Sequence, residues 1–212
     1  MQPKVITESR WKIAQNVEKN YWARVKCDPQ EYLRIIHEKY VFLNKINSNC
    51  PEVLNPPNGR PGQALEIGIG SLGIGVLSLL DSPSWELTGI DPQPQIQPDG
   101  IPSHLQALHQ ELMKKPLEYI QRPAENLGLE SSSYDLAACY NVLDHTHNPY
   151  AILQEIYRVL RPGGYFLLGL DALCLLNWMR FKAFIDDPPH PYKFTPWHVE
   201  RLLPNQGFKV LI

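Results

Sequence analysis

The stretch QALEIGIGSLGIG, residues 63–75, places four glycines directly behind a short apolar run. Gly68, Gly70 and Gly73 form a GxGxxG pattern, and a second apolar run follows at 74–80. Glycine has no Cβ, so this turn lets a ligand approach the backbone, and the start of a following helix offers free N–H groups. The stretch predicts a buried strand, a ligand-binding turn and a helix; a tight turn without a ligand is the alternative.

Apolar runs and helical patterns alternate on the C-terminal side of this turn. Strands are predicted at residues 64–69, 85–91, 117–123, 134–143 and 164–170, and helices at 74–80, 102–115 and 149–160. Strands that alternate with helices require right-handed crossovers. We therefore predict a doubly wound, mostly parallel Rossmann-like α/β sheet with its ligand beyond the carboxyl ends of the strands.

The N-terminal part has a different pattern. Apolar residues recur at helical spacing from Glu8 to about Ile46, with a break near residues 27–30, which predicts two helices. Residues 49–63 contain four prolines and two glycines, a composition typical of a linker. We expect a helical extension and linker at 1–62, followed by the ligand-binding domain at 63–212.

Composition and charge exclude several classes of protein. The formal net charge is −2, with both signs spread along the chain, which argues against nucleic acid as a partner. The four cysteines are widely spaced, so neither a disulfide framework nor a zinc site is expected. The apolar stretch at 165–179 is interrupted by Asp171 and is shorter than the roughly 20 residues of a membrane span. We expect a buried strand followed by a helix or loop there, and a cytoplasmic protein.

Two ligands compete for the glycine turn. Asp91 follows Gly73 by eighteen positions, a spacing that suits the ribose of a dinucleotide and an NAD(P)-dependent oxidoreductase. Glu66, however, precedes Gly68 by two positions, where its carboxylate would repel a pyrophosphate. A cationic or amine-bearing ligand fits that position better.

The segment LEIGIGSLG resembles the first motif of the class I S-adenosylmethionine-dependent methyltransferases, an acidic residue followed by x-Gly-x-Gly. Four further segments resemble motifs of this family in the same order, over residues 63–208: LTGIDPQP, RPAENL, YDLAACYNVLDH and EIYRVLRPGGYFLLG. Within the last segment, Pro162 and Gly163 suit a type II turn with a positive φ at the glycine. The resemblance implies a methyltransferase fold that binds S-adenosylmethionine.

The resemblance also implies the cofactor site. Asp91 would accept hydrogen bonds from the ribose hydroxyls, and Glu66 would face the amino-acid end. The full set of expected cofactor residues is Glu66, Gly68, Gly70, Gly73, Asp91, Pro92, Ala124, Glu125 and Asn141. Pro123 stands where the family often has an acidic residue, so Glu125 or a backbone carbonyl would have to bind the adenine amine.

The acceptor side carries no comparable signature, because aligned reactants need little further catalysis for methyl transfer. We expect a small-molecule or glycan- or lipid-linked acceptor, and a monomer or homodimer. His145 is the candidate base, since imidazole titrates near neutral pH; alternatively, Asp144 and the nearby histidines cap the helix that begins near Pro149. No metal is expected, because His145 and His147 supply only part of a ligand set.

Aromatic residues are the remaining candidates for acceptor contact. Trp11, Tyr21 and Trp22 of the extension, with His147 and Tyr192, are predicted to line the acceptor pocket. The alternative is that the rings only pack the helices onto the sheet. A methyltransferase-like module that binds without catalysis is the third functional hypothesis.

The C-terminal part predicts a helix and an incomplete sheet. Thr195 and Pro196 suit the cap and first turn of a helix. Residues 207–212 resemble the sixth strand of the family, but the antiparallel seventh strand that normally lies between the fifth and the sixth has no counterpart in the sequence.

Overall fold

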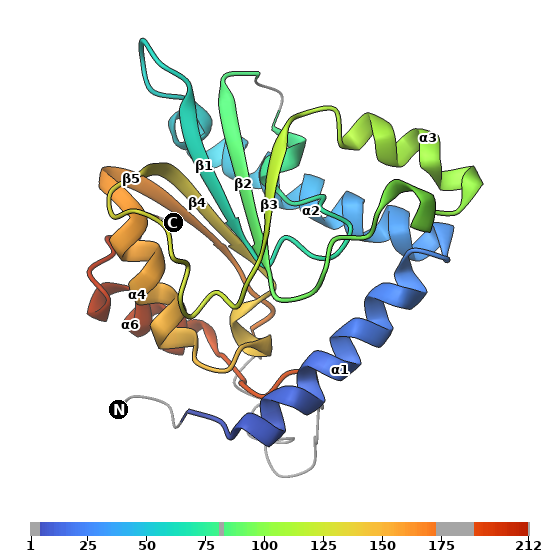
Figure 1. Ribbon diagram of the computed structural model, residues 1–212. Coiled ribbons are helices and arrows are strands. Elements are labelled where there is room, and N and C mark those ends of the chain that lie inside the picture. The colour runs from blue at the N-terminus through green and yellow to red at the C-terminus, as the bar shows by residue number, and fades with distance from the viewer. Residues whose placement is uncertain (1–4, 81–82, 173–188, 212) are drawn as a thin grey trace.

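The computed structural model describes residues 5–80, 83–172 and 189–211 (Figure 1). In chain order its elements are α1 (Glu8–Val25), α2 (Pro29–Asn49), η1 (Pro51–Leu54), β1 (Gly62–Ile67), η2 (Leu77–Leu79), β2 (Trp85–Asp91), η3 (Pro98–Gly100), α3 (Ser103–Leu112), β3 (Leu117–Gln121), β4 (Tyr134–Tyr140), η4 (Leu143–His145), α4 (Pro149–Val159), β5 (Leu160–Gly169) and α6 (Pro196–Asn205), where η marks a 3-10 turn. Most of the helix or loop expected after the fifth strand lies outside the described residues.

Five strands form one sheet in the order β3-β2-β1-β4-β5, and every neighbouring pair is parallel. The doubly wound α/β fold is therefore confirmed, and all five strands lie at the predicted positions within a few residues. The strand order reverses between β1 and β4. In sheets of this kind ligands bind beyond the carboxyl ends of the strands at the reversal.

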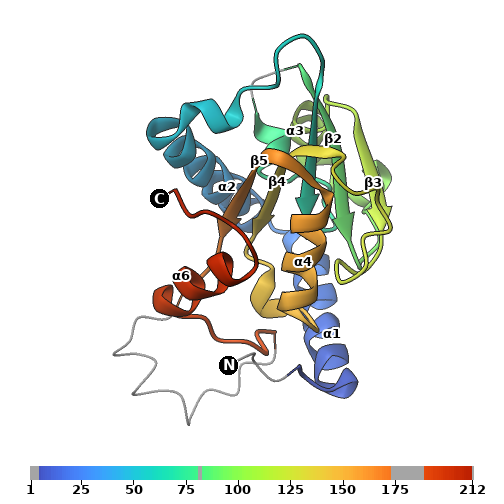
Figure 2. The ribbon, with the colours of Figure 1, turned by 90° about the vertical axis from the view of Figure 1, so that its left-hand side faces the viewer.

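Helices cover both faces of the sheet, as Figure 2 shows for α2 and α4. Leu43 and Ile46 of α2 pack with Ala64 of β1 on one face. Ile152 and Ile156 of α4 pack with Leu65 of β1 on the other face. Consecutive residues of β1 thus serve two separate cores, which is why the strand is apolar throughout rather than alternating.

The two N-terminal helices form as predicted, and the break between them has a local cause. Asp28 accepts hydrogen bonds from the backbone N–H groups of Gln30 and Glu31 and so caps the start of α2. Pro29 occupies the first turn, where its missing N–H costs nothing. Thr195 caps α6 in the same way, as predicted.

The helix expected at 74–80 is wrong. Only the 3-10 turn η2 forms there, because the segment is too short for a stable helix, and the Glu66 side chain accepts the backbone N–H groups of Val76 and Leu77. The prediction for Gly163 is confirmed, since its φ is +83°. β5 nevertheless includes this turn, and residues 161–164 lie between the Tyr134↔Leu160 and Leu136↔Tyr165 pairs.

The sixth strand expected at 207–212 is also wrong for the residues described there, 207–211, which join no sheet. Phe208 packs instead against Tyr157 and Phe166, while Val210 and Leu211 are exposed. A strand needs a neighbouring backbone for its hydrogen bonds. Among the described residues, no strand pairs with this segment through backbone hydrogen bonds, although Phe166 of β5 packs against Phe208.

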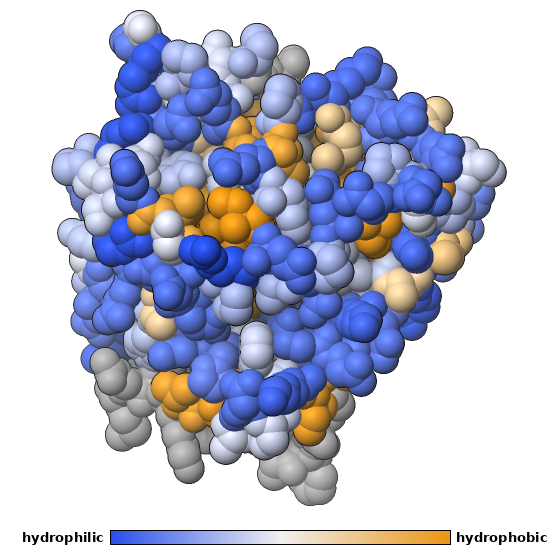
Figure 3. All heavy atoms as spheres, in the orientation of Figure 1, coloured by the Kyte–Doolittle hydropathy of each residue, from blue (hydrophilic) through white to orange (hydrophobic). Residues whose placement is uncertain are grey.

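The face of the molecule drawn in Figure 3 is mostly hydrophilic, and its hydrophobic residues lie in separate small patches. Among the described residues, no helix has both the length and the apolar composition needed to cross a membrane.

The N-terminal cap of α4 can be tested by mutation. Asn148, and not Asp144 or the histidines, accepts the N–H groups of Tyr150 and Ala151. We expect Asn148→Ala to lower the free energy of unfolding by about 1 kcal/mol, measured by urea denaturation. The control Asn44→Ala, at an exposed position inside α2, should leave stability unchanged or slightly raised. Equal stability of wild type and Asn148→Ala would contradict the capping role.

Candidate active site

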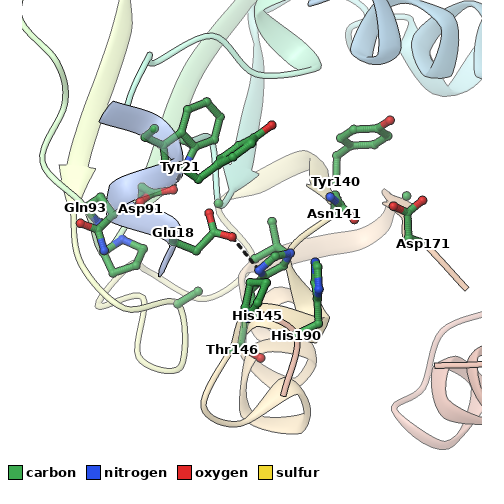
Figure 4. A pocket seen from close by; sticks show the side chains of 18 of the residues that line it. Glu18, Tyr21, Asp91, Gln93, Tyr140, Asn141, His145, Thr146, Asp171 and His190 are labelled. Atoms are coloured by element: carbon green, nitrogen blue, oxygen red, sulfur yellow. Dashed lines mark hydrogen bonds and ion pairs between the residues drawn. The ribbon is translucent and has the colours of Figure 1, made fainter. Parts of the chain in front are cut away.

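A cavity of about 1060 Å³ lies at the reversal point of the strand order. Ligand pockets in proteins commonly measure about 300 to 1,000 Å³, so the space suffices for a cofactor and an acceptor together. Its walls come from the ends of β2 and β4, the glycine turn after β1, helices α1 and α2, and the segment at 189–190. Figure 4 shows side chains from these elements pointing into the same space.

The glycine turn forms the bare part of the cavity wall. Gly68 and Gly70 line the cavity with φ values of +68° and +83°, in the left-handed region that favours glycine. The indole of Trp22 in α1 covers the turn: a Cβ on Gly70 would lie 2.6 Å from its Cζ2 atom. Any side chain at Gly70 would therefore displace the helix that closes the cavity.

Asp91 ends β2 and presents its carboxylate to the cavity. Its Oδ2 accepts the N–H of Gly70 at 2.9 Å, and its Oδ1 accepts the N–H of Gln93 at 2.8 Å. Burial raises the pKa of this carboxyl to about 6, although the two N–H donors act in the opposite direction. The structure thus holds an acceptor-rich group in place, with lone pairs left for a ligand.

Glu66, which was expected to serve the amino-acid end directly or through water, does not line the cavity. Its carboxylate is buried and accepts the N–H groups of Val76 at 2.6 Å and Leu77 at 2.9 Å. Burial raises the pKa of Glu66, and the neighbouring charge of Lys39 lowers it. A contact between Glu66 and the cofactor therefore stays a prediction, because Glu66 is not among the residues that line the cavity.

Lys39 of α2 is a cavity residue that the sequence did not indicate. Its buried Nζ donates to the carbonyl oxygens of Ile69, at 3.4 Å, and Ile74, at 2.5 Å, on the glycine turn. Burial lowers its pKa, while Glu66 and Asp91 raise it. A cation thus lies between the two carboxylates that the sequence analysis selected.

The predicted adenine segment reaches the cavity. Ala124, Glu125, Pro92 and Asn141 all line it. The Glu125 carboxylate is already engaged, because its Oε1 accepts the N–H groups of His147 and Asn148. Asn141 follows β4 with a φ of +57° and points its side chain into the space shown in Figure 4.

A second group of polar side chains lies at the other side of the cavity. His145 is placed there as predicted, and its Nδ1 lies 2.8 Å from Oε1 of Glu18 in α1. The His190 ring meets the His145 ring edge-on, with centroids 4.3 Å apart. Glu18 went unnoticed in the sequence because a charged residue on an amphipathic helix normally faces solvent.

Helix α1 forms the wall opposite the strand ends. Trp11, Tyr21 and Trp22 line the cavity as predicted. Burial raises the pKa of the Tyr21 hydroxyl to about 12, so it stays protonated at neutral pH. Gln15 accepts the side-chain N–H of Gln93 at 3.0 Å, which ties the helix to the end of β2.

Besides Glu66, three predicted residues lie outside the cavity wall. Gly73 packs beside Gln95, because a Cβ on Gly73 would lie 2.5 Å from the Gln95 Nε2 atom. His147 packs beside Trp11, with ring centroids 6.0 Å apart. Tyr192 is buried, where its hydroxyl donates to the carbonyl of His147 and accepts the N–H of Ile6. Its role is structural, because it ties the N-terminal segment to the loop after β4.

Comparisons with known proteins agree with this geometry. A family model described as "Methyltransferase domain" matches residues 65–168. The human thiol S-methyltransferase TMT1A is 30% identical over 185 residues, which cover 84% of this chain and 69% of that protein. The ubiquinone biosynthesis O-methyltransferase of Pseudomonas syringae pv. syringae is 30% identical over 125 residues, 58% of this chain and 50% of that protein.

Solved structures show the same fold. The 1,6-didemethyltoxoflavin-N1-methyltransferase of Burkholderia thailandensis, solved with 1,6-didemethyltoxoflavin and S-adenosylhomocysteine bound, superposes with a TM-score of 0.59 at 16% identity. The match covers 97% of this chain and 82% of that one. At this identity the likeness shows the fold alone. The chain spans about half the length of several curated relatives it matches.

Three findings indicate the same family: the parallel sheet, the glycine turn beside the fixed Asp91 carboxylate, and the similarity to TMT1A over 69% of its length. The chain belongs to the class I S-adenosylmethionine-dependent methyltransferases, a family of enzymes.

Proposed function

We propose that this chain binds S-adenosylmethionine in the cavity and transfers its methyl group to a small-molecule thiol. The observation that carries the cofactor assignment is the position of Asp91. Its carboxylate is held at the end of β2 by the N–H groups of Gly70 and Gln93, beside a turn without side chains. A pair of ribose hydroxyls, which need adjacent acceptors, suits this group.

The other residues around the cavity fit the same cofactor. Gly68 and Gly70 leave room for the amino-acid part, and Lys39 supplies a cation for its carboxylate. Ala124 and Glu125 border the adenine side. A phosphate needs several free backbone N–H donors, but Glu66 already accepts the N–H groups of Val76 and Leu77. This disfavours a dinucleotide and with it the oxidoreductase hypothesis.

When bound, S-adenosylmethionine supplies a methyl group on a sulfonium, which an acceptor displaces in line. The chain's own task is to orient the acceptor and remove its proton. The Glu18 carboxylate, 2.8 Å from Nδ1 of His145, favours a proton on that nitrogen and leaves Nε2 to accept one from the acceptor. The walls formed by Trp11 and Tyr21 exclude water from the acceptor.

Acidity favours a thiol over a hydroxyl. An ordinary thiol has a pKa of about 8.5 and a phenol one near 10, so a base such as His145 removes the proton of a thiol more easily. The thiolate is also the more reactive nucleophile. The similarity to a protein named as a thiol S-methyltransferase supports the same choice.

The raised pKa of Asp91 gives the cofactor assignment a pH test. Hydroxyl donors favour the ionised carboxylate, and the free carboxyl has a pKa of about 6, so affinity should rise as the pH rises through 6 and fall below it. We expect S-adenosylhomocysteine to bind Asp91→Asn more weakly by about 1 to 3 kcal/mol, without this pH dependence, in calorimetric titrations between pH 5 and 8.

The exposed Asp99→Asn variant is the control and should behave as wild type. An unchanged pH profile in folded Asp91→Asn would show that the ribose is bound elsewhere. Binding of NAD without binding of S-adenosylhomocysteine would overturn the cofactor assignment.

Labelled-methyl transfer to matched acceptors tests the thiol assignment. We expect 2-mercaptoethanol and thiophenol to be methylated faster than ethylene glycol and phenol. His145→Gln should lower the rate by about 100- to 10,000-fold with S-adenosylhomocysteine affinity unchanged, the range for loss of a positioned base. His147→Gln, in the same loop but outside the cavity wall, is the control. Methylation of the alcohols alone would contradict the thiol assignment while leaving the methyltransferase assignment intact.

A further inference from the structure

Three side chains with metal-binding atoms come together on the acceptor side of the cavity. Asp144 and His145 belong to η4, and His190 comes from a segment 45 positions later in the chain. One ligand atom from each lies within 4.8 Å of the other two. From the sequence no metal was expected, because no third ligand lies near His145 and His147 in the chain. The fold brings His190 beside His145, as Figure 4 shows.

Asp144 supplies an independent indication of a missing ligand. The residue is only 5% exposed, and no described residue donates a hydrogen bond to its Oδ1. Nε2 of His145 lies 3.8 Å from this oxygen, beyond hydrogen-bond distance. Leaving a buried carboxylate oxygen without a donor costs free energy, so such atoms in native proteins usually bind something further.

His145 lies beside a second carboxylate, in the place where metal-binding histidines commonly have one. Its Nδ1 lies 2.8 Å from the Glu18 carboxylate, while its Nε2 is the atom on the Asp144 side. In metal sites a carboxylate behind the imidazole orients the ring and favours the tautomer whose opposite nitrogen carries the lone pair. Glu18 therefore lies where a residue that orients a ligand should lie.

We propose that Asp144, His145 and His190 bind a divalent transition-metal ion, most favourably zinc. Two imidazoles and one carboxylate suit zinc, while magnesium and calcium prefer sites made of oxygen atoms. Three protein ligands leave a fourth tetrahedral position open, the arrangement of catalytic rather than structural zinc sites. His145 and His190 line the cavity, so that position faces the acceptor.

The ion would also act on the acceptor, an extension that rests on the proposed function. A thiol that binds the open position does so as a thiolate, and its proton passes to the solvent. No electrons are transferred, and the sulfur keeps a lone pair for attack on the methyl group. In the metal-bound enzyme His145 is then a metal ligand. The ion, instead of a base, promotes loss of the thiol proton by lowering the pKa of the thiol.

Metal titration of the full chain tests the site. After removal of metals with a chelator, we expect one equivalent of zinc to bind by calorimetry, and cobalt(II) to give the visible absorption of a tetrahedral site. Glu18→Gln should weaken zinc binding about 10- to 100-fold, the range for loss of an orienting partner. Asp144→Asn and His190→Ala should weaken it at least as much. His147→Ala, a neighbouring histidine outside the cluster, should bind as wild type.

Two results would overturn the site: no zinc binding by the wild-type chain, or binding unchanged in both Asp144→Asn and His190→Ala. Binding abolished only by alkylation of the cysteines would likewise assign the ion elsewhere. His190→Ala is expected to fold, because His190 is only half-buried. Retained binding of S-adenosylhomocysteine by this variant would show that the cavity is folded. Zinc binding without thiol methylation would overturn the proposed acceptor and support the site, so the two failures are distinguishable.

Discussion

The ammonium group of Lys39 is buried inside the turn that follows β1, and the arrangement of the cavity depends on it. It donates to two carbonyl oxygens of the turn, those of Ile69 and Ile74, and its charge lies near the carboxylates of Glu66 and Asp91. A buried charge is tolerated only when such partners surround it, and removal of one partner leaves the others uncompensated. Through this contact α2 becomes part of the ligand site instead of an appendage.

The same contact explains how the glycine turn is shared between two tasks. Glu66 binds the N–H groups at the start of η2 on the far side of the turn, while Gly68 and Gly70 keep the near side free for a ligand. The sequence predicts that a carboxylate before the glycines disfavours a phosphate by repulsion. The reason differs, since Glu66 consumes the donors that a phosphate would use instead of facing the ligand.

Much of the fold could be predicted because its signals are local. β2 coincides with the predicted 85–91, and Asp28 and Thr195 cap helices with their own side chains. The errors at 74–80 and 207–211 concern segments whose structure depends on distant backbone. In the site, the positions of Asp91 and His145 could be predicted because Asp91 ends β2 and His145 lies in the loop after β4. Glu18 and Lys39 could not, because a charge on an amphipathic helix is normally solvated, and only the packing of α1 and α2 on the strand ends covers Glu18 in part and buries Lys39.

The central claim is that α1 and the glycine turn together enclose the cofactor. Hydrogen–deuterium exchange with and without saturating S-adenosylhomocysteine tests it most directly, because exchange reports local opening of each segment. The account predicts slower exchange in α1, residues 8–25, and in the turn at 68–75, with no change on addition of NAD. Saturated binding with protection confined to other segments, and none in α1, would contradict it.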